Sequence, residues 1–168
     1  MMGSGKTTAG RALAARLGCR YIDSDEQVEA CTGRSVPEIF AADGEAAFRR
    51  EETRALGVAL ASDEPVVVSV AGGAVLAACN RDRLRRDATV VWLRARPATL
   101  AARVGDGAGR PLLVHDPAGT LAALDRVRRP LYAEVADVAV DVDTLWPHDV
   151  VDAIVRRVVR LRAGTEWQ

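Results

Sequence analysis

The sequence predicts an α/β fold in which helices flank a parallel sheet, and three observations favour it. Strand-like and helical patterns alternate along the 168 residues without an internal repeat or a linker, so we expect one domain over 1–168. Two segments, 66–70 and 89–93, are apolar on both faces, which is typical of buried parallel strands. A glycine-rich turn and a lysine precede the first helical pattern, as at the phosphate sites of such sheets.

The first half of the chain follows from hydrophobic spacing and from residues that start or stop helices. Gly18 and Gly33 are predicted helix stops, and Ser35 with Glu38 three residues later is a predicted helix start. The predicted elements are helices over 6–17, 26–32 and 44–61, a short helix beginning at Ser35, and a strand over 19–22.

The second half repeats the alternation and contains one long irregular segment. Between 104 and about 120 the pattern dissolves into glycine, proline and charge, which predicts a mobile lid loop. Residues 164–168 are expected to form a frayed tail. The predicted elements are strands over 66–70, 89–93 and 138–142 and helices over 80–86, 97–103, 121–135 and 148–161.

The stretch from Met1 to Thr8 reads MMGSGKTT and predicts a phosphate-binding loop. Gly3-Ser4-Gly5 lets the backbone curl with its N–H groups inward. Lys6 places a positive charge beside the β- and γ-phosphates of a nucleotide, and the Thr7 hydroxyl can hold Mg²⁺. The alternative is a glycine-rich turn that carries a lysine by chance.

The full motif, G-x-x-x-x-G-K-[ST], has its first glycine one position before Met1. A P-loop also follows a parallel strand, usually the central one of its sheet. We therefore expect the first strand of this fold to be missing from the chain, through a late start or a shortened sequence.

Composition limits the classes of function. The 23 basic and 23 acidic residues cancel, so no net field favours nucleic acid or an acidic membrane. Cys19, Cys31 and Cys79 form no C-x-x-C pair and only two histidines accompany them, so neither a zinc site nor a disulfide framework is indicated. We expect reduced thiols in a cytoplasmic protein without a membrane span or secretion signal.

Acidic and basic residues after the P-loop are candidates for a second substrate site. Asp23 and Asp25 follow a strand, and in an extended chain they would point to the same side; helix capping is the alternative. Arg49 lies one helical turn from Glu45 and from Glu52, which suits bidentate recognition of a carboxylate. A solvated helical face with surface ion pairs would give the same spacing.

Glycines and arginines later in the chain add to this site. Gly72 and Gly73 end a predicted buried strand and would allow a ligand to approach the backbone, although a tight turn has the same sequence. Arg103, Arg110 and Arg128 lie in or beside the predicted lid and could neutralise phosphates.

These groups, in this order, resemble the shikimate kinase family over nearly the whole chain. The motifs are Gly3-Ser4-Gly5-Lys6-Thr7, Asp23-Ser24-Asp25, Gly44-Glu45 with Phe48-Arg49 and Glu52, Ala71-Gly72-Gly73, Arg110-Pro111-Leu112-Leu113 and Arg128-Arg129-Pro130-Leu131-Tyr132. The resemblance implies a nucleoside monophosphate kinase-like fold with a five-stranded parallel sheet. It also implies a helical substrate-binding region at about 24–61 and a lid at about 104–120.

The resemblance further implies transfer of phosphate from ATP, with Mg²⁺, to the 3-hydroxyl of shikimate by a monomeric enzyme of aromatic amino acid biosynthesis. The implied catalytic residues are Lys6, Asp25 and Arg110. Thr7 would bind Mg²⁺ directly and Asp23 through water. The implied ATP-binding residues are Gly3, Ser4, Gly5, Lys6, Thr7, Thr8, Arg103, Arg110 and Pro147, and the implied shikimate-binding residues are Asp25, Arg49, Gly72, Gly73 and Arg128.

One departure and two alternatives accompany this resemblance. Ala71 stands where the family usually has glycine, and we expect a negative φ there, which alanine tolerates. The nearest alternative is a kinase of the same fold that acts on another hydroxylated acid such as gluconate, or on a nucleoside monophosphate. The other is a non-catalytic, truncated nucleotide-binding relative.

Overall fold

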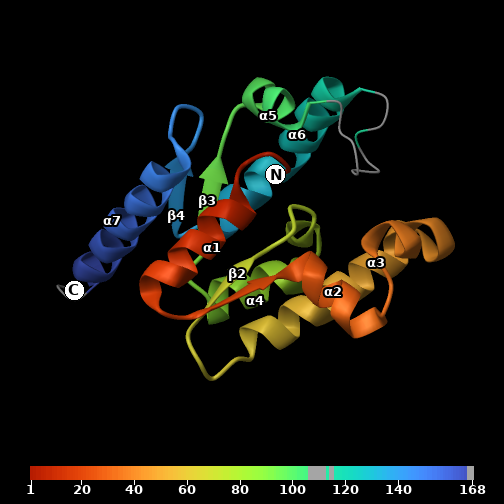
Figure 1. The fold of residues 1–168 in the computed structure, drawn as a ribbon, viewed down its shortest axis with the longest axis horizontal. Helices are drawn as coiled ribbons and strands as arrows, with labels where there is room; N and C mark the ends of the chain where they lie inside the picture. The colour runs from red at the N-terminus through yellow and green to blue at the C-terminus, as the bar shows by residue number, and fades with distance from the viewer. Residues whose placement is uncertain (106–112, 114–115, 166–168) are drawn as a thin grey trace.

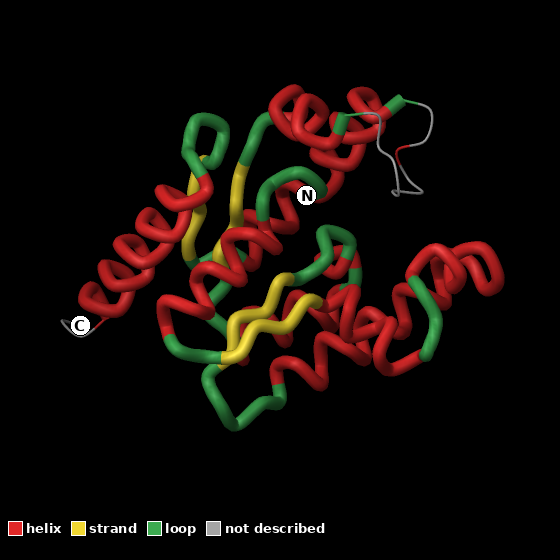
Figure 2. Tube along the Cα trace, viewed as in Figure 1, coloured by secondary structure: helices red, strands yellow, loops and turns green. Residues whose placement is uncertain are grey.

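Four short parallel strands form two separate pairs in the structure, a computed structural model that describes residues 1–105, 113 and 116–165. In one pair, β1 (Arg20–Asp23) lies beside β2 (Val66–Ser69) with Arg20 opposite Val66. In the other, β3 (Val91–Arg94) lies beside β4 (Val138–Asp141) with Val91 opposite Val138. Figures 1 and 2 show the two pairs, with helices around both. Within the described residues no strand joins β2 to β3.

This separation corrects the expected burial of the two apolar strands, although their parallel pairing is confirmed. Val66, Val67 and Val68 are all partly exposed, and only Ser69 of β2 is buried. In β3, Leu93 is the one buried residue. Burial of both faces requires helices packed over each face, and in the described structure that cover is only partial.

Besides the strands, the described part of the chain contains seven α-helices and the short 3₁₀-helix η1. The left-handed glycine stops at Gly18 and Gly33 are confirmed, and so is the start at Ser35, whose side chain and that of Glu38 form a reciprocal capping box. The elements are α1 (Lys6–Leu17), α2 (Ser24–Thr32), α3 (Val36–Leu60), η1 (Ala74–Leu76), α4 (Ala78–Asp87), α5 (Pro97–Val104), α6 (Pro117–Val135) and α7 (Pro147–Thr165).

Several predicted boundaries were wrong. Helix α2 begins at Ser24, two residues before the predicted start at 26, because Asp23 caps it. Helix α6 begins at Pro117, inside the segment predicted as lid, and Asp116 caps it. Helix α7 continues to Thr165, so the predicted tail is helical at its first two positions, and 166–168 lie outside the described residues.

Helix α3 is bent at Gly44, whose φ of 77° and ψ of 175° are not helical. The bend separates the short helix predicted from Ser35 from the longer one predicted over 44–61. Glycine suits this position because a side chain at positive φ would be strained.

Apolar packing forms a larger and a smaller cluster. The larger includes fully buried Leu100, Leu121 and Val140 and joins α5 and α6 to β3 and β4. The smaller, around Val28 and Ile39, joins α2 to α3. Helix α1 packs against β2 of one strand pair and against α7, which packs on β4 of the other pair.

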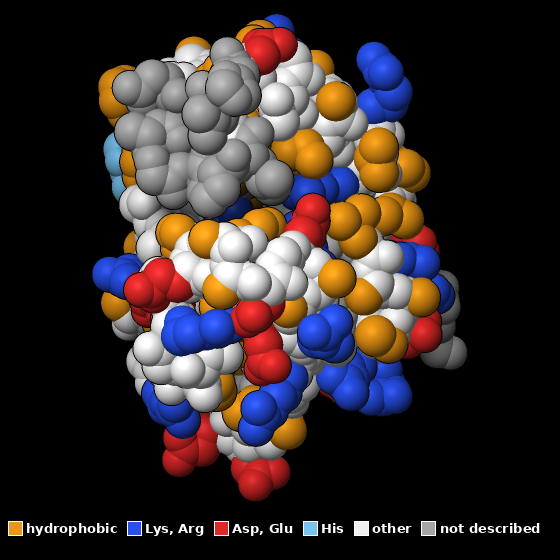
Figure 3. Space-filling model, turned by 90° about the vertical axis from the view of Figure 1, so that its right-hand side faces the viewer, with side chains coloured by type: hydrophobic (Ala, Val, Ile, Leu, Met, Phe, Trp, Pro, Cys, Tyr) orange, Lys and Arg blue, Asp and Glu red, His pale blue; other side chains and the backbone are white. Residues whose placement is uncertain are grey.

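The surface is mixed in charge. Figure 3 shows acidic and basic side chains interspersed over the face on the right-hand side of Figure 1. None of the helices in the described chain combines the length and apolar character needed to cross a bilayer.

Candidate active site

The predicted curl of the phosphate loop is confirmed. Gly3 and Gly5 have positive φ, 74° and 85°, and the Ser4 hydroxyl donates to the Met1 carbonyl oxygen at 2.9 Å. The Lys6 Nζ donates to the same oxygen at 3.0 Å and so lies over the loop. Gly5 caps α1 without a side-chain hydrogen bond, which leaves the first N–H groups of α1 directed at this site.

Asp23 ties the P-loop to the start of α2. One carboxylate oxygen, Oδ2, accepts from Thr7 Oγ1 at 3.3 Å and from Tyr21 Oη at 3.0 Å. The other, Oδ1, accepts from the Asp25 backbone N–H at 3.1 Å. Asp23 is therefore a helix cap, as in the helix-capping alternative, and Asp25 lies in the first turn of α2 and not in an extended chain.

The Thr7 hydroxyl and the Asp23 carboxylate together fit Mg²⁺. This ion prefers oxygen ligands, keeps several waters and is usually held by one or two protein groups together with phosphates. No cluster of three His, Cys, Asp or Glu side chains able to hold a metal occurs among the described residues.

Asp25 carries a buried carboxylate oxygen, Oδ1, that has no hydrogen-bond partner in the structure. Burial raises the pKa of Asp25 and the Asp23 charge raises it further, while Lys6 and Arg49 lower it. The group is thus a carboxylate near two cations with one oxygen available to a ligand.

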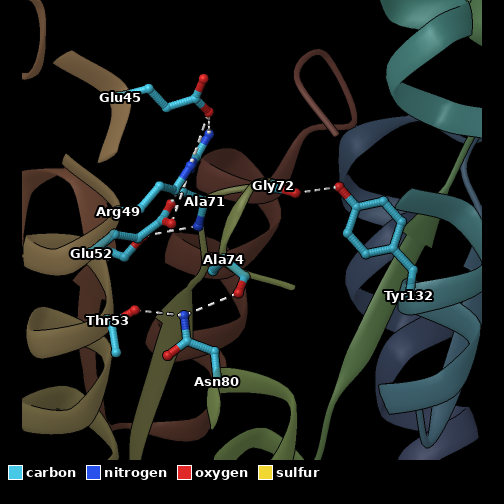
Figure 4. A network of polar contacts seen from close by, with 10 residues as sticks. Glu45, Arg49, Glu52, Thr53, Ala71, Gly72, Ala74, Asn80 and Tyr132 are labelled. Atoms are coloured by element: carbon cyan, nitrogen blue, oxygen red, sulfur yellow. Dashed lines mark hydrogen bonds and ion pairs between the residues drawn. The ribbon is translucent and has the colours of Figure 1, made fainter. Parts of the chain in front are cut away.

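Arg49 is held on α3 by two carboxylates (Figure 4). Its Nη1 donates to both carboxylate oxygens of Glu52 at 3.0 Å, and its Nη2 donates to Glu45 Oε1 at 2.7 Å. The Glu52 side chain is 1% exposed, so the interpretation as a solvated helical face is wrong for this pair. Burial raises the pKa of Glu52, and the charges of Arg49 and Arg128 oppose that rise.

The glycine turn after β2 lies directly against Arg49. A Cβ on Gly73 would stand 2.1 Å from Arg49 Nη1, so the guanidinium lies over bare backbone. The Gly72 carbonyl oxygen accepts from Tyr132 Oη at 2.7 Å. Ala71 does not have a positive φ, which confirms that alanine is unstrained there, and its N–H donates to Ser24 Oγ at 2.9 Å.

Gly73→Ala is expected to raise the KM for the carboxylate-bearing acceptor about tenfold while the KM for ATP changes less than about twofold. The added methyl group must displace a guanidinium that Glu45 and Glu52 hold in place. Steady-state kinetics with each substrate varied checks this. Gly57→Ala is the matched control, because its Cβ would also meet an arginine, Arg83 Nη1 at 2.6 Å, outside this site.

Helix α6, which reaches this turn through Tyr132, also carries Arg128. Arg128 is 5% exposed, and its charge reaches both Glu52 on α3 and Tyr132 one turn along α6. Arg49 and Arg128, which lie 79 positions apart in the sequence, therefore act on the same buried carboxylate.

The predicted nucleotide residues are placed less completely. Arg103 Nη2 donates to the Val142 carbonyl oxygen at 2.6 Å, which holds α5 beside the loop that leads from β4 to Pro147. Thr8 is exposed in the first turn of α1. Arg110 and most of the predicted lid lie outside the described residues, although Leu113 is fully buried in the larger cluster.

Sequence reasoning gave no role to two buried polar residues near the site. Tyr132 was quoted only as the last residue of the motif Arg128-Arg129-Pro130-Leu131-Tyr132, and its one further signal was its position four residues after Arg128 on the same helical face. Asn80 had none, because it lies in a charged helical run. In the structure it is fully buried, and its Nδ2 donates to Thr53 Oγ1 at 3.1 Å and to the Ala74 carbonyl oxygen at 3.0 Å.

Comparison with known proteins decides the family. The family model described as shikimate kinase matches residues 2–159. The chain belongs to the shikimate kinase family. The shikimate kinase of Symbiobacterium thermophilum is 48% identical over 161 residues, which cover 94% of this chain and 92% of that protein.

Solved structures of the family agree with the fold. The shikimate kinase from Acinetobacter baumannii in complex with shikimate has a TM-score of 0.90 and 36% identity, and the match covers 95% of this chain and 89% of that chain. The shikimate kinase from Aquifex aeolicus has a TM-score of 0.82 and 30% identity, over 94% of this chain and 92% of that chain. The predicted P-loop kinase fold and the predicted family are thus confirmed.

Proposed function

We propose that the chain transfers the γ-phosphoryl group of ATP to the 3-hydroxyl of shikimate, giving shikimate 3-phosphate and ADP, in aromatic amino acid biosynthesis. The observation that carries the proposal is the arrangement beside the P-loop. Two arginines from different helices, Arg49 and Arg128, both lower the pKa of the buried Glu52 carboxylate. Lys6 and Arg49 likewise lower the pKa of Asp25. A substrate with a carboxylate and neighbouring hydroxyls matches this set of groups.

Recognition of the acceptor follows from these contacts. Arg49 donates to Glu45 and Glu52 from three of its nitrogens, so its plane is fixed before a ligand arrives. A fixed guanidinium loses less entropy on binding a carboxylate than a free one. Gly72 and Gly73 give room to Tyr132 Oη and to the Arg49 guanidinium on one side of the acceptor pocket, and Arg128 completes its cationic side.

The transfer itself is mostly positioning and charge neutralisation. The acceptor oxygen forms a bond to the γ-phosphorus as the bond from that phosphorus to the β–γ bridging oxygen breaks, and the hydroxyl proton passes to Asp25. Lys6 and the N–H groups at the start of α1 stabilise the phosphoryl oxygens, and we assign the same role to Arg110. Mg²⁺, when bound, neutralises phosphate charge, and Thr7 with Asp23 would hold it, the latter through water.

Asp25→Asn is expected to lower kcat by about 10²-fold or more, because general base catalysis contributes on that order. Because the pKa of Asp25 is raised by burial, the acidic limb of the rate–pH profile should lie above the ordinary aspartate value of 3.8 and disappear in the variant. The folded state holds this proton more tightly than the unfolded chain. Its stabilising contribution is therefore fully present below 3.8 and is lost as pH rises through the raised pKa.

The measurement is kcat against pH with saturating substrates, together with thermal unfolding of both proteins. Asp87→Asn is the control, since Asp87 is paired with Arg86 on the surface of α4. An acidic limb that survives in Asp25→Asn would remove Asp25 from the base role.

A coupled ADP-release assay with shikimate, gluconate and AMP tests the function itself. We expect turnover with shikimate, because the paired arginines favour a carboxylate and disfavour a nucleotide acceptor. Turnover of gluconate but not of shikimate would show that gluconate, and not shikimate, is the acceptor. If calorimetry shows ATP binding but none of the three acceptors is phosphorylated, the chain is a non-catalytic nucleotide-binding relative of the family.

The remaining expectations stay predictions that the same protein can test. They are a single domain over 1–168, a monomer, a cytoplasmic location, MgATP as the phosphate donor, and Arg103 with Pro147 beside adenine.

A further inference from the structure

Two groups of polar contacts join α6 to the part of the described chain that contains β2 and α4. One is the surface ion pair between Glu134 and Arg81, with Glu134 Oε1 3.1 Å from Arg81 Nε, which Arg85 extends at 4.0 Å. The other is the partly buried hydrogen bond from Tyr132 Oη to the Gly72 carbonyl oxygen, 2.7 Å long. Figure 4 shows Tyr132 reaching across to the glycine turn.

The local structure fixes the Tyr132 ring tightly. Tyr132 is 7% exposed, and its ring packs on Trp92 of β3 with 5.7 Å between the ring centres. A Cβ on Gly72 would stand 3.0 Å from Tyr132 Oη, so glycine is what allows the short contact. The φ of Gly72 is not positive, and backbone conformation therefore does not explain this glycine.

Each end of the bond lies next to one of the two arginines proposed to bind the acceptor. Gly73, the residue after Gly72, lies against the Arg49 guanidinium. Arg128 lies on α6, one helical turn before Tyr132. Arg49 and Arg128 belong to parts of the chain whose strands are not paired with each other in the described structure. Helix α6 packs directly on η1, the segment that follows Gly73, and the Tyr132 bond lies at this contact.

We propose that Tyr132 is a positioning residue that sets the spacing of Arg49 and Arg128 through its bond to Gly72, and thereby the affinity for the acceptor carboxylate. The proposal rests on the proposed function. Its physical basis is that a two-pronged clamp binds a rigid carboxylate well only at one separation, and small displacements of a positioned group cost much of its effect.

Tyr132→Phe removes one oxygen and keeps the ring against Trp92. We expect the KM for shikimate to rise about tenfold, as for loss of one intramolecular hydrogen bond, with kcat and the KM for ATP changed less than about twofold. Glu134→Gln is the matched control, because it weakens the other link from the same helix; there we expect all three constants to stay within about twofold.

Two further measurements separate positioning from general stability. Shikimate amide, which lacks the charged carboxylate, should show the same KM with wild type and Tyr132→Phe. In an Arg128→Lys background, Tyr132→Phe should raise the KM for shikimate by less than it does alone, since both changes act on one clamp.

The remaining outcomes of these measurements would contradict either the positioning role of Tyr132 or the proposed function on which it rests. Equal increases in both KM values, or an equal increase for shikimate amide, would show a merely structural role. No change in the shikimate KM would show that the bond does not set the clamp. A wild-type protein that neither binds shikimate by calorimetry nor phosphorylates it would overturn the proposed function, and this inference with it.

Discussion

Lys6→Ala is expected to lower kcat about 10³-fold or more while the protein stays folded, since one preorganised charge at a developing anion contributes on that order. Lys6 is the only lysine in the sequence, and all 22 other basic residues are arginines. It reaches back over the P-loop to the Met1 carbonyl oxygen at 3.0 Å, where a single compact charge fits inside the curl. The measurements are kcat and the unfolding temperature of both proteins.

The single lysine permits an independent check. An amine-reactive reagent can modify only Lys6 and the α-amino group, so peptide mass spectrometry should show ATP protecting Lys6 from modification. Lys6→Met is the control for the side-chain stem and should lose kcat to the same extent. Retained turnover in either variant, or modification of Lys6 that ATP does not slow, would contradict the P-loop assignment.

Arg49→Ala is expected to raise the KM for shikimate about 100-fold, because a bidentate charge-assisted contact is lost, and to leave the KM for ATP nearly unchanged. It should also destabilise the protein by about 3–5 kcal/mol, because Glu52 is left as an unpaired buried charge. Steady-state kinetics and denaturant unfolding measure the two effects separately.

A second substitution separates binding from stability. Arg49→Ala combined with Glu52→Gln removes the buried charge, so we expect most of the stability to return and the KM for shikimate to stay high. Arg54→Ala is the control, since Arg54 is an exposed arginine on the same helix that pairs with Glu51. Equal effects of Arg49→Ala on both substrates would place Arg49 outside the acceptor pocket.

Local sequence spacing predicted the parts of the site that lie within one element. The three-residue and four-residue separations from Arg49 to Glu52 and Glu45 predicted their contacts, and the glycines of the P-loop predicted its curl. Such contacts depend on neighbours along one helix or turn and not on how elements pack.

Sequence spacing could not predict the contacts between segments that are far apart in the chain. Tyr132 and Gly72 are 60 residues apart, and Arg103 and Val142 are 39 apart, so no spacing rule links them. The burial of Glu52 also depends on packing, since its neighbours in sequence are charged. The sequence also left open whether Asp23 and Asp25 lie in an extended chain or at a helix start, and the cap formed by Asp23 places Asp25 in the first turn of α2.

The separation of the two strand pairs makes helices α1 and α6 the elements that connect them. Helix α1 packs against β2 and against α7, and Tyr132 of α6 donates to the Gly72 carbonyl oxygen just after β2. A substitution that loosens either contact should therefore lower the stability of the fold and weaken acceptor binding together.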